Sequence, residues 1–148
     1  MKLIKTLLSR WSLPQAYAHC DVPCGIYDPK AAQTAAATVK KMIEKMTALE
    51  KPVNGEKIEL LNYKNTLTRC ILVKEEHARI CKEELLILWT DFFKPEHLEK
   101  YPNLHETFWK AAKLCSKNKQ EVNIPAAESL VGAVDEIANM VHAIQENH

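Results

Sequence analysis

Four segments of this chain carry apolar residues at the three- and four-residue spacing of amphipathic helices, and no convincing two-residue alternation appears. The first segment opens after Asp28-Pro29 and ends near the turn-forming residues 52–55. Its apolar face consists of Ala35, Val39, Met42, Ile43, Met46 and Leu49. The second segment is the longest, at roughly thirty residues. Its apolar positions are Leu60, Leu67, Ile71, Ala78, Cys81, Leu85, Leu88 and Phe92.

Two further long helices follow a break at residues 91–95. Pro95 suits the first turn of a short helical piece and Pro102 suits the start of the third main helix, because proline is tolerated where a helix begins. The buried face of the third helix is predicted to consist of Leu104, Thr107, Phe108, Ala111, Leu114 and Cys115. The fourth helix begins around residues 123–125. Its apolar face consists of Ala127, Leu130, Val134, Ile137, Ala138, Val141 and Ile144.

The connections between these helices are short, which favours antiparallel packing of neighbours. A chain of 148 residues is long enough for one domain with a sizeable core and too short for two ordinary ones. The pattern therefore predicts an all-α fold, an antiparallel four-helix bundle with an irregular N-terminal arm. Apolar stripes of this kind indicate core packing and no particular chemistry, so the function must be sought in the arm.

Charge and hydropathy argue against two classes of partner. Lys and Arg number 20 against 19 Asp and Glu, which gives a formal net charge of +1. No strong basic field is therefore available to hold nucleic acid or an anionic membrane surface. No window approaches about 18 uncharged apolar residues, so we expect no transmembrane segment. We expect no nucleic-acid partner and no membrane partner.

Residues 1–18 have some features of a segment that is removed. The tripeptide AYA at residues 16–18 has the small residues of a signal-peptidase site, and two lysines give a charged start. Polar residues at 5–6 and 9–10 interrupt the apolar stretch, which therefore lacks the run of roughly 7–15 apolar residues that export requires. We interpret residues 1–18 as a removable propeptide of a cytoplasmic protein. The alternative is a leader that exports the protein.

Residues 19–27, called the hook below, carry the chemistry of the arm. A cut after Ala18 would make His19 a new N-terminus, which would place a free α-amine, an imidazole and a thiolate on His19 and Cys20. A second thiolate at Cys24 can close this chelate, because a neighbouring proline and glycine let a short loop reverse direction. The pattern indicates a metal-binding site.

Two structural alternatives exist on the local sequence. A disulfide between Cys20 and Cys24 would close the same loop, although five cysteines in the chain do not suit a full set of disulfides. A structural zinc site would need four closed side-chain ligands, whereas the hook offers three. The remaining cysteines sit singly among helical apolar positions and are expected to be small buried residues: Cys70, Cys81 and Cys115.

The motif His-Cys-Asp-x-Pro-Cys-Gly-x-Tyr-Asp-Pro at residues 19–29 resembles the nickel-binding hook of nickel-containing superoxide dismutases. Residues 89–95 (WTDFFKP) and 100–105 (KYPNLH) also resemble segments of that family. The resemblance covers most of residues 19–110 and weakens toward the C-terminus. It implies a four-helix bundle assembled as a homohexamer with a hook at each N-terminus, which agrees with the helical pattern.

The resemblance also implies the ligands and the reaction. The thiolates of Cys20 and Cys24, the backbone nitrogen of Cys20 and the α-amine of His19 would surround one nickel ion per subunit, with the His19 imidazole as axial ligand in the oxidised state. Soft, anionic donors suit a metal that alternates between Ni(II) and Ni(III) while superoxide becomes oxygen and hydrogen peroxide. Asp21 would hold the loop by accepting hydrogen bonds. Tyr27 would order water and limit access at the open face of the metal.

The chain departs from the family near the axial imidazole. Well-known members place a Glu after the hook and an Arg on the second helix, and these positions fall here on Ala35 and His77. A Tyr that is often beside the site falls on Phe92. A metal-bound imidazole usually donates its second N–H to an acceptor, so His77 of a neighbouring subunit is the candidate partner. The alternative is a histidine that only fills a subunit interface.

The remaining histidines have no partner at metal-ligand spacing. We expect them at the surface or at helix ends: His97, His105, His142 and His148.

Together these features predict an enzyme, a nickel superoxide dismutase, with a propeptide at residues 1–18 and the four-helix domain at residues 19–148. Superoxide is the expected substrate, and a maturation endopeptidase is the expected partner that removes the propeptide. Two other classes stay open. One is a nickel- or copper-carrying protein that uses the same chelate without turnover. The other is an exported helical interaction domain whose N-terminal loop is closed by a disulfide.

Overall fold

A computed structural model of the chain describes residues 26–53 and 55–146. Within these ranges the regular structure is helical and no strand is present. The four long helices are α2 (Lys30–Thr47), α3 (Lys57–Ile87), α5 (Leu104–Gln120) and α6 (Ile124–Gln145). Two short elements lie between α3 and α5: the π-helical turn η1 (Leu88–Phe92) and α4 (His97–Lys100).

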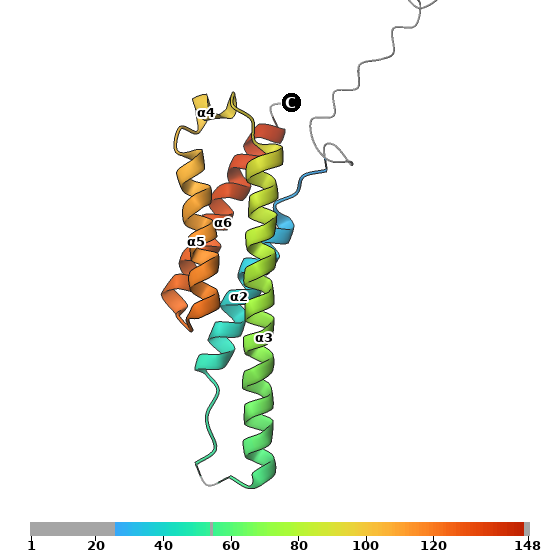
Figure 1. The fold of residues 1–148 in the computed structure, drawn as a ribbon, viewed down its shortest axis with the longest axis vertical. Coiled ribbons are helices and arrows are strands. Elements are labelled where there is room, and N and C mark those ends of the chain that lie inside the picture. The colour runs from blue at the N-terminus through green and yellow to red at the C-terminus, as the bar shows by residue number, and fades with distance from the viewer. Residues whose placement is uncertain (1–25, 54, 147–148) are drawn as a thin grey trace, which may run out of the picture.

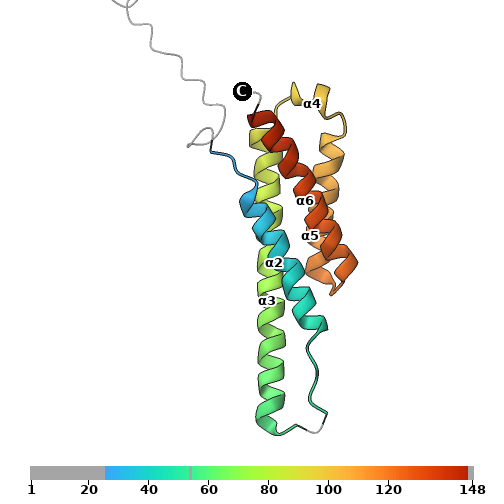
Figure 2. The ribbon, with the colours of Figure 1, turned by 180° about the vertical axis from the view of Figure 1, so that it is seen from behind.

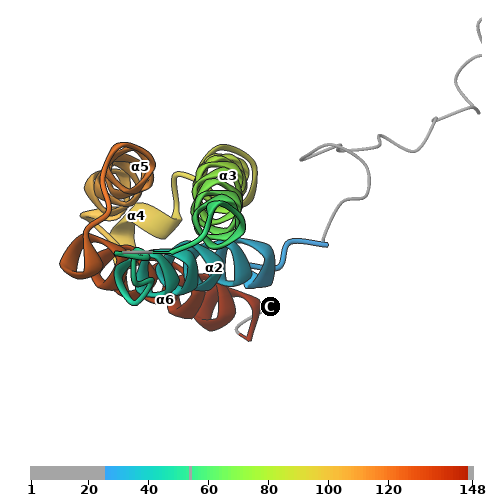
Figure 3. The ribbon, with the colours of Figure 1, turned by 90° about the horizontal axis from the view of Figure 1, so that it is seen from below.

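The four long helices form an antiparallel bundle (Figures 1 and 2). Successive helices run in opposite directions, and α4 lies across the end at which α3 stops and α5 starts. Seen along the bundle, α3 and α5 form one layer while α2 and α6 form the other (Figure 3). Each long helix packs against two others, α2 and α5 both contacting α3 and α6. The predicted fold class, an all-α four-helix bundle, is confirmed.

The core consists of the apolar faces that the periodicity predicts. On α2 the buried residues are small near the start and larger toward the end: Ala32, Ala35, Ala36, Val39, Ile43 and Met46. On α6 the predicted stripe is buried in full: Ala127, Leu130, Val134, Ile137, Ala138, Val141 and Ile144. The three cysteines of the bundle, Cys70, Cys81 and Cys115, are free and buried, as expected.

The second predicted stripe is only partly correct. Ile71 is 39% exposed, and the prediction that it lies on the buried face of α3 is wrong; its neighbour Cys70 is buried instead. The cause is the length of α3, whose first half extends beyond the ends of α5 and α6 in both side views (Figures 1 and 2). There the helix has fewer neighbours to cover it, so Ile58, Leu61 and Leu72 are also exposed.

The ends of the helices are set by local hydrogen bonds. Glu56 and Glu59 form a reciprocal capping box that starts α3, and the side chain of Asn123 accepts a bond from the Ala126 amide to cap α6. Helix α2 stops at Thr47, slightly before the predicted end, so Leu49 lies outside it. No helix in the described ranges meets the length and apolarity needed to cross a membrane.

A buried lysine stabilises the turn between α5 and α6. Lys74 of α3 is 3% exposed, and its Nζ donates to the carbonyl oxygens of Asn118 at 2.7 Å, Lys119 at 2.5 Å and Glu121 at 3.4 Å. These carbonyls lie where α5 ends, so they have no partner within that helix, and a cation there also favours the helix dipole. Burial lowers the pKa of the Lys74 ammonium. A carboxylate oxygen of Glu75 on α3 lies 3.7 Å from the same Nζ, so one carboxylate and the carbonyl oxygens of the turn together hold the charge.

Candidate metal centre

The described part of the hook is its last two residues, Ile26 and Tyr27. The predicted ligands His19, Cys20 and Cys24, together with Asp21, lie outside the described residues. Tyr27 is the hook residue whose contacts with the bundle the structure describes.

Tyr27 is attached to the bundle by its ring and by its backbone. The ring is half-buried and packs against Phe92, with ring centroids 5.6 Å apart. Its carbonyl oxygen accepts a hydrogen bond of 2.7 Å from Nε2 of Gln145, in the last turn of α6. Residues from the start, middle and end of the chain thus meet at one end of the bundle. Tyr27, the last residue of the hook, is therefore fixed at this end.

Asp28 and Pro29 connect Tyr27 to the first residue of α2. The side chain of Asp28 accepts a 2.8 Å bond from the amide of Lys30, and the buried Pro29 precedes the first residue of α2. Proline is favoured at such a position because its fixed φ angle suits the start of a helix. The motif residues that follow Tyr27 therefore position the hook by anchoring its C-terminal end.

Phe92, which contacts Tyr27, belongs to a cluster of aromatic rings. Phe92 contacts Phe93 with centroids 5.0 Å apart, and Phe93 contacts both His97, at 5.8 Å, and Phe108, at 5.3 Å. The π-helical turn η1 makes this possible, because its extra residue per turn rotates the end of α3 before the chain extends at Phe93. Phe92, which stands at the family's frequent Tyr position, is thus in direct contact with the hook residue Tyr27.

Ala35 and His77, which replace the family's Glu and Arg, have different surroundings. Ala35 is 2% exposed and packs in the core face of α2, where it offers no acceptor. His77 on α3 has its Nδ1 2.9 Å from the carbonyl oxygen of Val73. A carbonyl oxygen can only accept, so Nδ1 carries the proton, and the neutral ring then has Nε2 as a hydrogen-bond acceptor.

The structure does not bring His77 and Tyr27 together within one chain. His77 and Phe92 are separated by about 22 Å along the helix, at roughly 1.5 Å per residue. Since the ring of Tyr27 contacts Phe92, His77 lies well away from Tyr27.

Three of the other histidines lie among the described residues, and two of them bond to neighbouring residues. Nδ1 of His97 accepts from the Lys94 amide at 3.1 Å, and Nδ1 of His105 accepts from Nε1 of Trp89 at 2.9 Å. His105 and His142 are exposed and His97 is the first residue of α4, so all three lie at the surface or at a helix end, as predicted. The ring of His97 is half-buried against Phe93. Gln145 could not be identified from the sequence, since its partner Tyr27 is 118 residues away and no local pattern connects the two.

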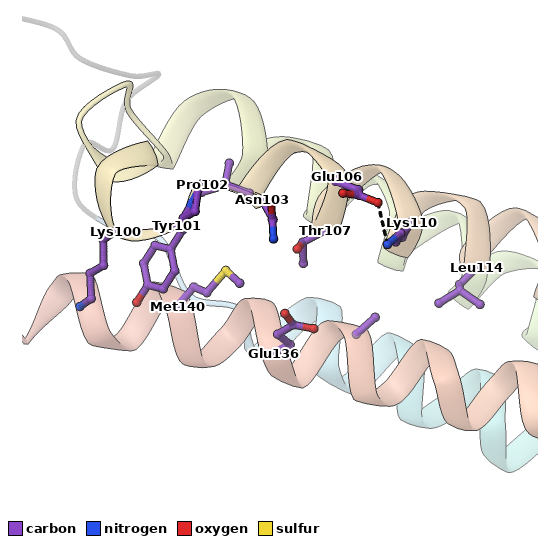
Figure 4. Close-up of a pocket in the computed structure, with 12 residues that line it drawn as sticks. Lys100, Tyr101, Pro102, Asn103, Glu106, Thr107, Lys110, Leu114, Glu136 and Met140 are labelled. Atoms are coloured by element: carbon purple, nitrogen blue, oxygen red, sulfur yellow. Dashed lines mark ion pairs between the residues drawn. The ribbon is translucent and has the colours of Figure 1, made fainter.

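The described residues contain no group of three or more His, Cys, Asp or Glu side chains that could hold a metal ion. A groove of about 480 Å³ does lie between α6 and the start of α5 (Figure 4). Its polar lining includes Glu106 and Lys110, which form an ion pair of 2.7 Å, and Glu136 on the opposite side. Because no thiol or imidazole lines it, this groove does not resemble the predicted centre.

Comparison with known proteins identifies the family. The model of the family described as nickel-containing superoxide dismutase matches residues 14–144. The superoxide dismutase [Ni] of Streptomyces seoulensis is 37% identical over 136 residues, which cover 90% of this chain and 92% of the relative. That of Streptomyces coelicolor (strain ATCC BAA-471 / A3(2) / M145) is 40% identical over 102 residues, covering 68% of this chain and 69% of the relative.

Solved structures agree with this result. A native nickel superoxide dismutase superimposes with a TM-score of 0.71 at 31% identity, covering 86% of this chain and 99% of that chain. A nickel-containing superoxide dismutase with the nickel ligation of the oxidised state has a TM-score of 0.72 at 32% identity, with the same coverage. The fold and these matches define an oxidoreductase of the superoxide dismutase class with a nickel cofactor. The chain belongs to the nickel-containing superoxide dismutase family.

Proposed function

We propose that this protein, once cut after Ala18, disproportionates superoxide at one nickel ion per subunit that is bound by His19, Cys20 and Cys24. The observation that carries the proposal is the family match, whose range of residues 14–144 includes the complete hook motif.

The donor set fits the metal. Cys20 and Cys24 would bind as thiolates, His19 through its α-amine and its imidazole, and Cys20 also through its deprotonated backbone nitrogen. Thiolates are soft, strongly donating ligands, and nitrogen and thiolate donors together suit nickel better than the oxygen donors preferred by magnesium or calcium. Nickel bound in this way supplies one-electron redox chemistry, by alternating between Ni(II) and Ni(III).

Tyr27 and Asp21 have supporting roles in this proposal. Tyr27 is anchored by Phe92 and Gln145, so its hydroxyl can act from a defined place to order water and to restrict access to small anions such as superoxide. Asp21 would accept hydrogen bonds within the hook and hold the loop in its binding conformation.

His77 is proposed as the acceptor for the second N–H of the His19 imidazole. Its Nδ1 is engaged with Val73, which leaves Nε2 as the acceptor that such a partner needs. A hook wrapped around a metal is much shorter than its extended length of about 28 Å. His77 of the same chain is therefore out of reach, and the contact requires a neighbouring subunit.

A homohexamer would supply that neighbour. The exposed apolar side chains on the outer face of α3, Ile58, Leu61 and Leu72, support association, since each of them is at least half exposed in the single chain. Burial of such residues between copies would remove apolar surface from water.

Residues 1–18 are proposed to be a propeptide and residues 19–148 the mature domain. While residues 1–18 are attached, the nitrogen of His19 is part of a peptide bond and cannot bind as an amine. A maturation endopeptidase would therefore activate the enzyme. We propose a cytoplasmic location, because the interrupted apolar stretch lacks the run that export requires; an export leader is the alternative.

The decisive experiment compares three forms of the chain, beginning at Met1, at Ala18 and at His19. Only the form that begins at His19 should contain about one nickel per chain and accelerate superoxide decay. The form that begins at Ala18 is the matched control, because it differs by a single residue yet moves the α-amine away from His19. Equal activity of these two forms would contradict the proposed ligand set. Full nickel content without superoxide decay would instead indicate a metal carrier.

A further inference from the structure

Two buried cysteines outside the hook face each other across a helix interface. Cys81 on α3 and Cys115 on α5 each have 0% exposure, and both are free. Neither has a part in the function proposed above. Buried cysteines often act only as small apolar residues. Whether these two thiols can also react depends on the groups around them.

Contacts before and after the two cysteines fix how α3 and α5 are aligned. Lys82 and Ser116, the residues directly after the two cysteines, are hydrogen-bonded from Nζ to Oγ at 3.2 Å. Lys74, two helical turns before Cys81, reaches the carbonyl of Asn118 near the end of α5. In an antiparallel pair, these contacts place Cys81 opposite Cys115.

The side chains near the cysteines allow a close approach of the two helices. Ala78 lies one turn before Cys81 and Ala111 lies one turn before Cys115, and both alanines have 0% exposure. Methyl side chains at a helix crossing permit backbones to come near one another. This matters because a disulfide requires Cα atoms roughly 4.4–6.8 Å apart, a separation that facing positions of closely packed helices can reach.

The two thiols are not equivalent. The neighbouring thiol of Cys115, together with burial, raises the pKa of Cys81, so Cys81 keeps its proton. The neighbouring thiol of Cys81 lowers the pKa of Cys115 against the opposing effect of burial, and the positive charge of Lys82 lowers it further. Cys115 is thus the thiol that more readily becomes a thiolate, which is the nucleophilic form.

A groove of about 470 Å³ runs along the surface between α3 and α5. Its lining includes Lys82 and Ser116, the neighbours of the two cysteines, together with Glu83 and Lys119. A small polar molecule in the groove would contact the residue that follows each cysteine, while the two thiols themselves lie below the surface.

We propose that Cys81 and Cys115 form a peroxide-reactive dithiol site, which hydrogen peroxide reaches from the groove between α3 and α5 and converts to a disulfide that links these helices.

The reaction has two steps. The Cys115 thiolate attacks one oxygen of hydrogen peroxide, the O–O bond breaks, and the released hydroxide takes up a proton to become water. Cys115 is then a sulfenic acid. The sulfur of Cys81 attacks the sulfur of Cys115, the S–O bond breaks, and the departing hydroxide leaves as water with the Cys81 proton. In total, two thiols are oxidised to one disulfide and one peroxide is reduced to two waters.

The biological source of the peroxide rests on the proposed function, since superoxide disproportionation produces it. The reactivity of the dithiol does not, because peroxide can be added directly. The test therefore uses the full chain with Cys20→Ser and Cys24→Ser, which removes the hook thiols and any nickel chemistry. Cys70, Cys81 and Cys115 remain. Failure of the dithiol proposal is then distinct from failure of the proposed enzyme.

After treatment with hydrogen peroxide and unfolding in an alkylating agent, the chain should have lost two of its three alkylatable thiols. Tryptic peptides 80–82 and 114–117 should appear joined and should separate on reduction, whereas Cys70 should stay alkylated as a free thiol. Cys70 is the matched control, because it is also buried on α3, at 4% exposure. Recovery of free Cys81 and Cys115, or equal oxidation of Cys70, would overturn the proposal.

A second variant tests the role of the lysine. Lys82→Met should slow disulfide formation several-fold at neutral pH and shift the pH profile of the rate to higher pH, because the thiolate of Cys115 loses its neighbouring positive charge. Lys82→Arg should restore the profile. An unchanged profile in Lys82→Met would show that Lys82 does not assist the thiolate.

Discussion

The two ends of α5 and α6 are stabilised by different chemistry. At the hook end, the chain is held by apolar ring contacts between Tyr27 and Phe92 and by one exposed hydrogen bond from Gln145. At the opposite end, the α5–α6 turn is held by the buried ammonium of Lys74, which donates to three carbonyl oxygens. A buried charge stabilises the turn end, whereas ring packing and a single exposed hydrogen bond stabilise the hook end. The function and the stability of this protein should therefore be separable by mutation.

The largest effect is expected at the hook. Cys20→Ser or Cys24→Ser should abolish superoxide dismutase activity, because each removes a thiolate that both binds nickel and supports its oxidation. The helical content should stay unchanged, since the described core is built from residues between Ala32 and Ile144. Superoxide decay, metal analysis and far-UV circular dichroism on the chain beginning at His19 measure these outcomes.

Cys70→Ser is the control for the hook variants. It should keep the activity and the nickel content, because Cys70 is a buried thiol of α3 and forms no part of the hook. Equal loss of activity in Cys70→Ser and Cys20→Ser, with folding unchanged in both, would remove the hook from the centre of the mechanism.

The second-largest effect is expected on stability, at the α5–α6 turn. Lys74→Met keeps the aliphatic part of the side chain and leaves buried carbonyl oxygens without a donor, which should lower the free energy of unfolding by about 2–3 kcal/mol. Activity per folded, nickel-loaded molecule should stay the same. Urea unfolding followed by circular dichroism gives the first quantity, and the superoxide assay gives the second.

Lys40→Met is the matched control for Lys74→Met. Lys40 Nζ lies 3.4 Å from a carboxylate oxygen of Glu128, but both side chains are exposed to water. Surface ion pairs of this kind contribute about 0–1 kcal/mol. If Lys40→Met destabilised the protein as much as Lys74→Met, the stabilising role assigned to the buried lysine would be wrong.

A smaller effect is expected from His77. His77→Ala should lower activity about tenfold while the nickel content stays nearly unchanged, since loss of a hydrogen-bond partner of a metal-bound imidazole has consequences of this order. His77→Gln keeps an acceptor oxygen and should retain more activity. His105→Ala, the exposed control, should change little. A His77→Ala protein that is nickel-loaded, hexameric and fully active would exclude the proposed contact.

The smallest effect is expected from Gln145. Gln145→Ala removes the donor to the Tyr27 carbonyl and should lower activity by about twofold, which corresponds to a fraction of a kcal/mol in the barrier. Gln33→Ala removes a comparable exposed bond of 2.8 Å to Asp135 and should leave activity unchanged. Identical activities for these two variants would argue that the anchor of Tyr27 does not affect the site.

The bundle is predictable from the sequence because its helices bury continuous apolar stripes. Phe108, Ala111 and Cys115 follow one another at helical spacing, so the buried face of α5 can be derived without coordinates. Ile71 could not be placed in the same way, since its exposure depends on where α5 and α6 end beside α3. Periodicity describes one helix and contains no information on the length of its neighbours.

The surroundings of the candidate site were less predictable. The hook motif identifies the expected ligands, but Gln145 and Lys74 bond to residues 118 and 44 positions away, respectively, and such pairs leave no pattern in a single sequence. A lysine among apolar residues would ordinarily be assigned to the surface. Its burial becomes understandable only when the carbonyl oxygens at the end of α5 are seen to converge on it.

The bond between Gln145 and Tyr27 has a practical consequence for producing this protein. Because the last turn of α6 bonds to Tyr27, the last residue of the proposed hook, an affinity tag fused after α6 would begin near the chain that leads to the proposed nickel ligands. A polyhistidine tag would add competing imidazoles at that place, and any tag left before His19 would block its amine. The connection between α2 and α3, at the far end of the molecule in Figures 1 and 2, is the insertion point that interferes least with metal loading.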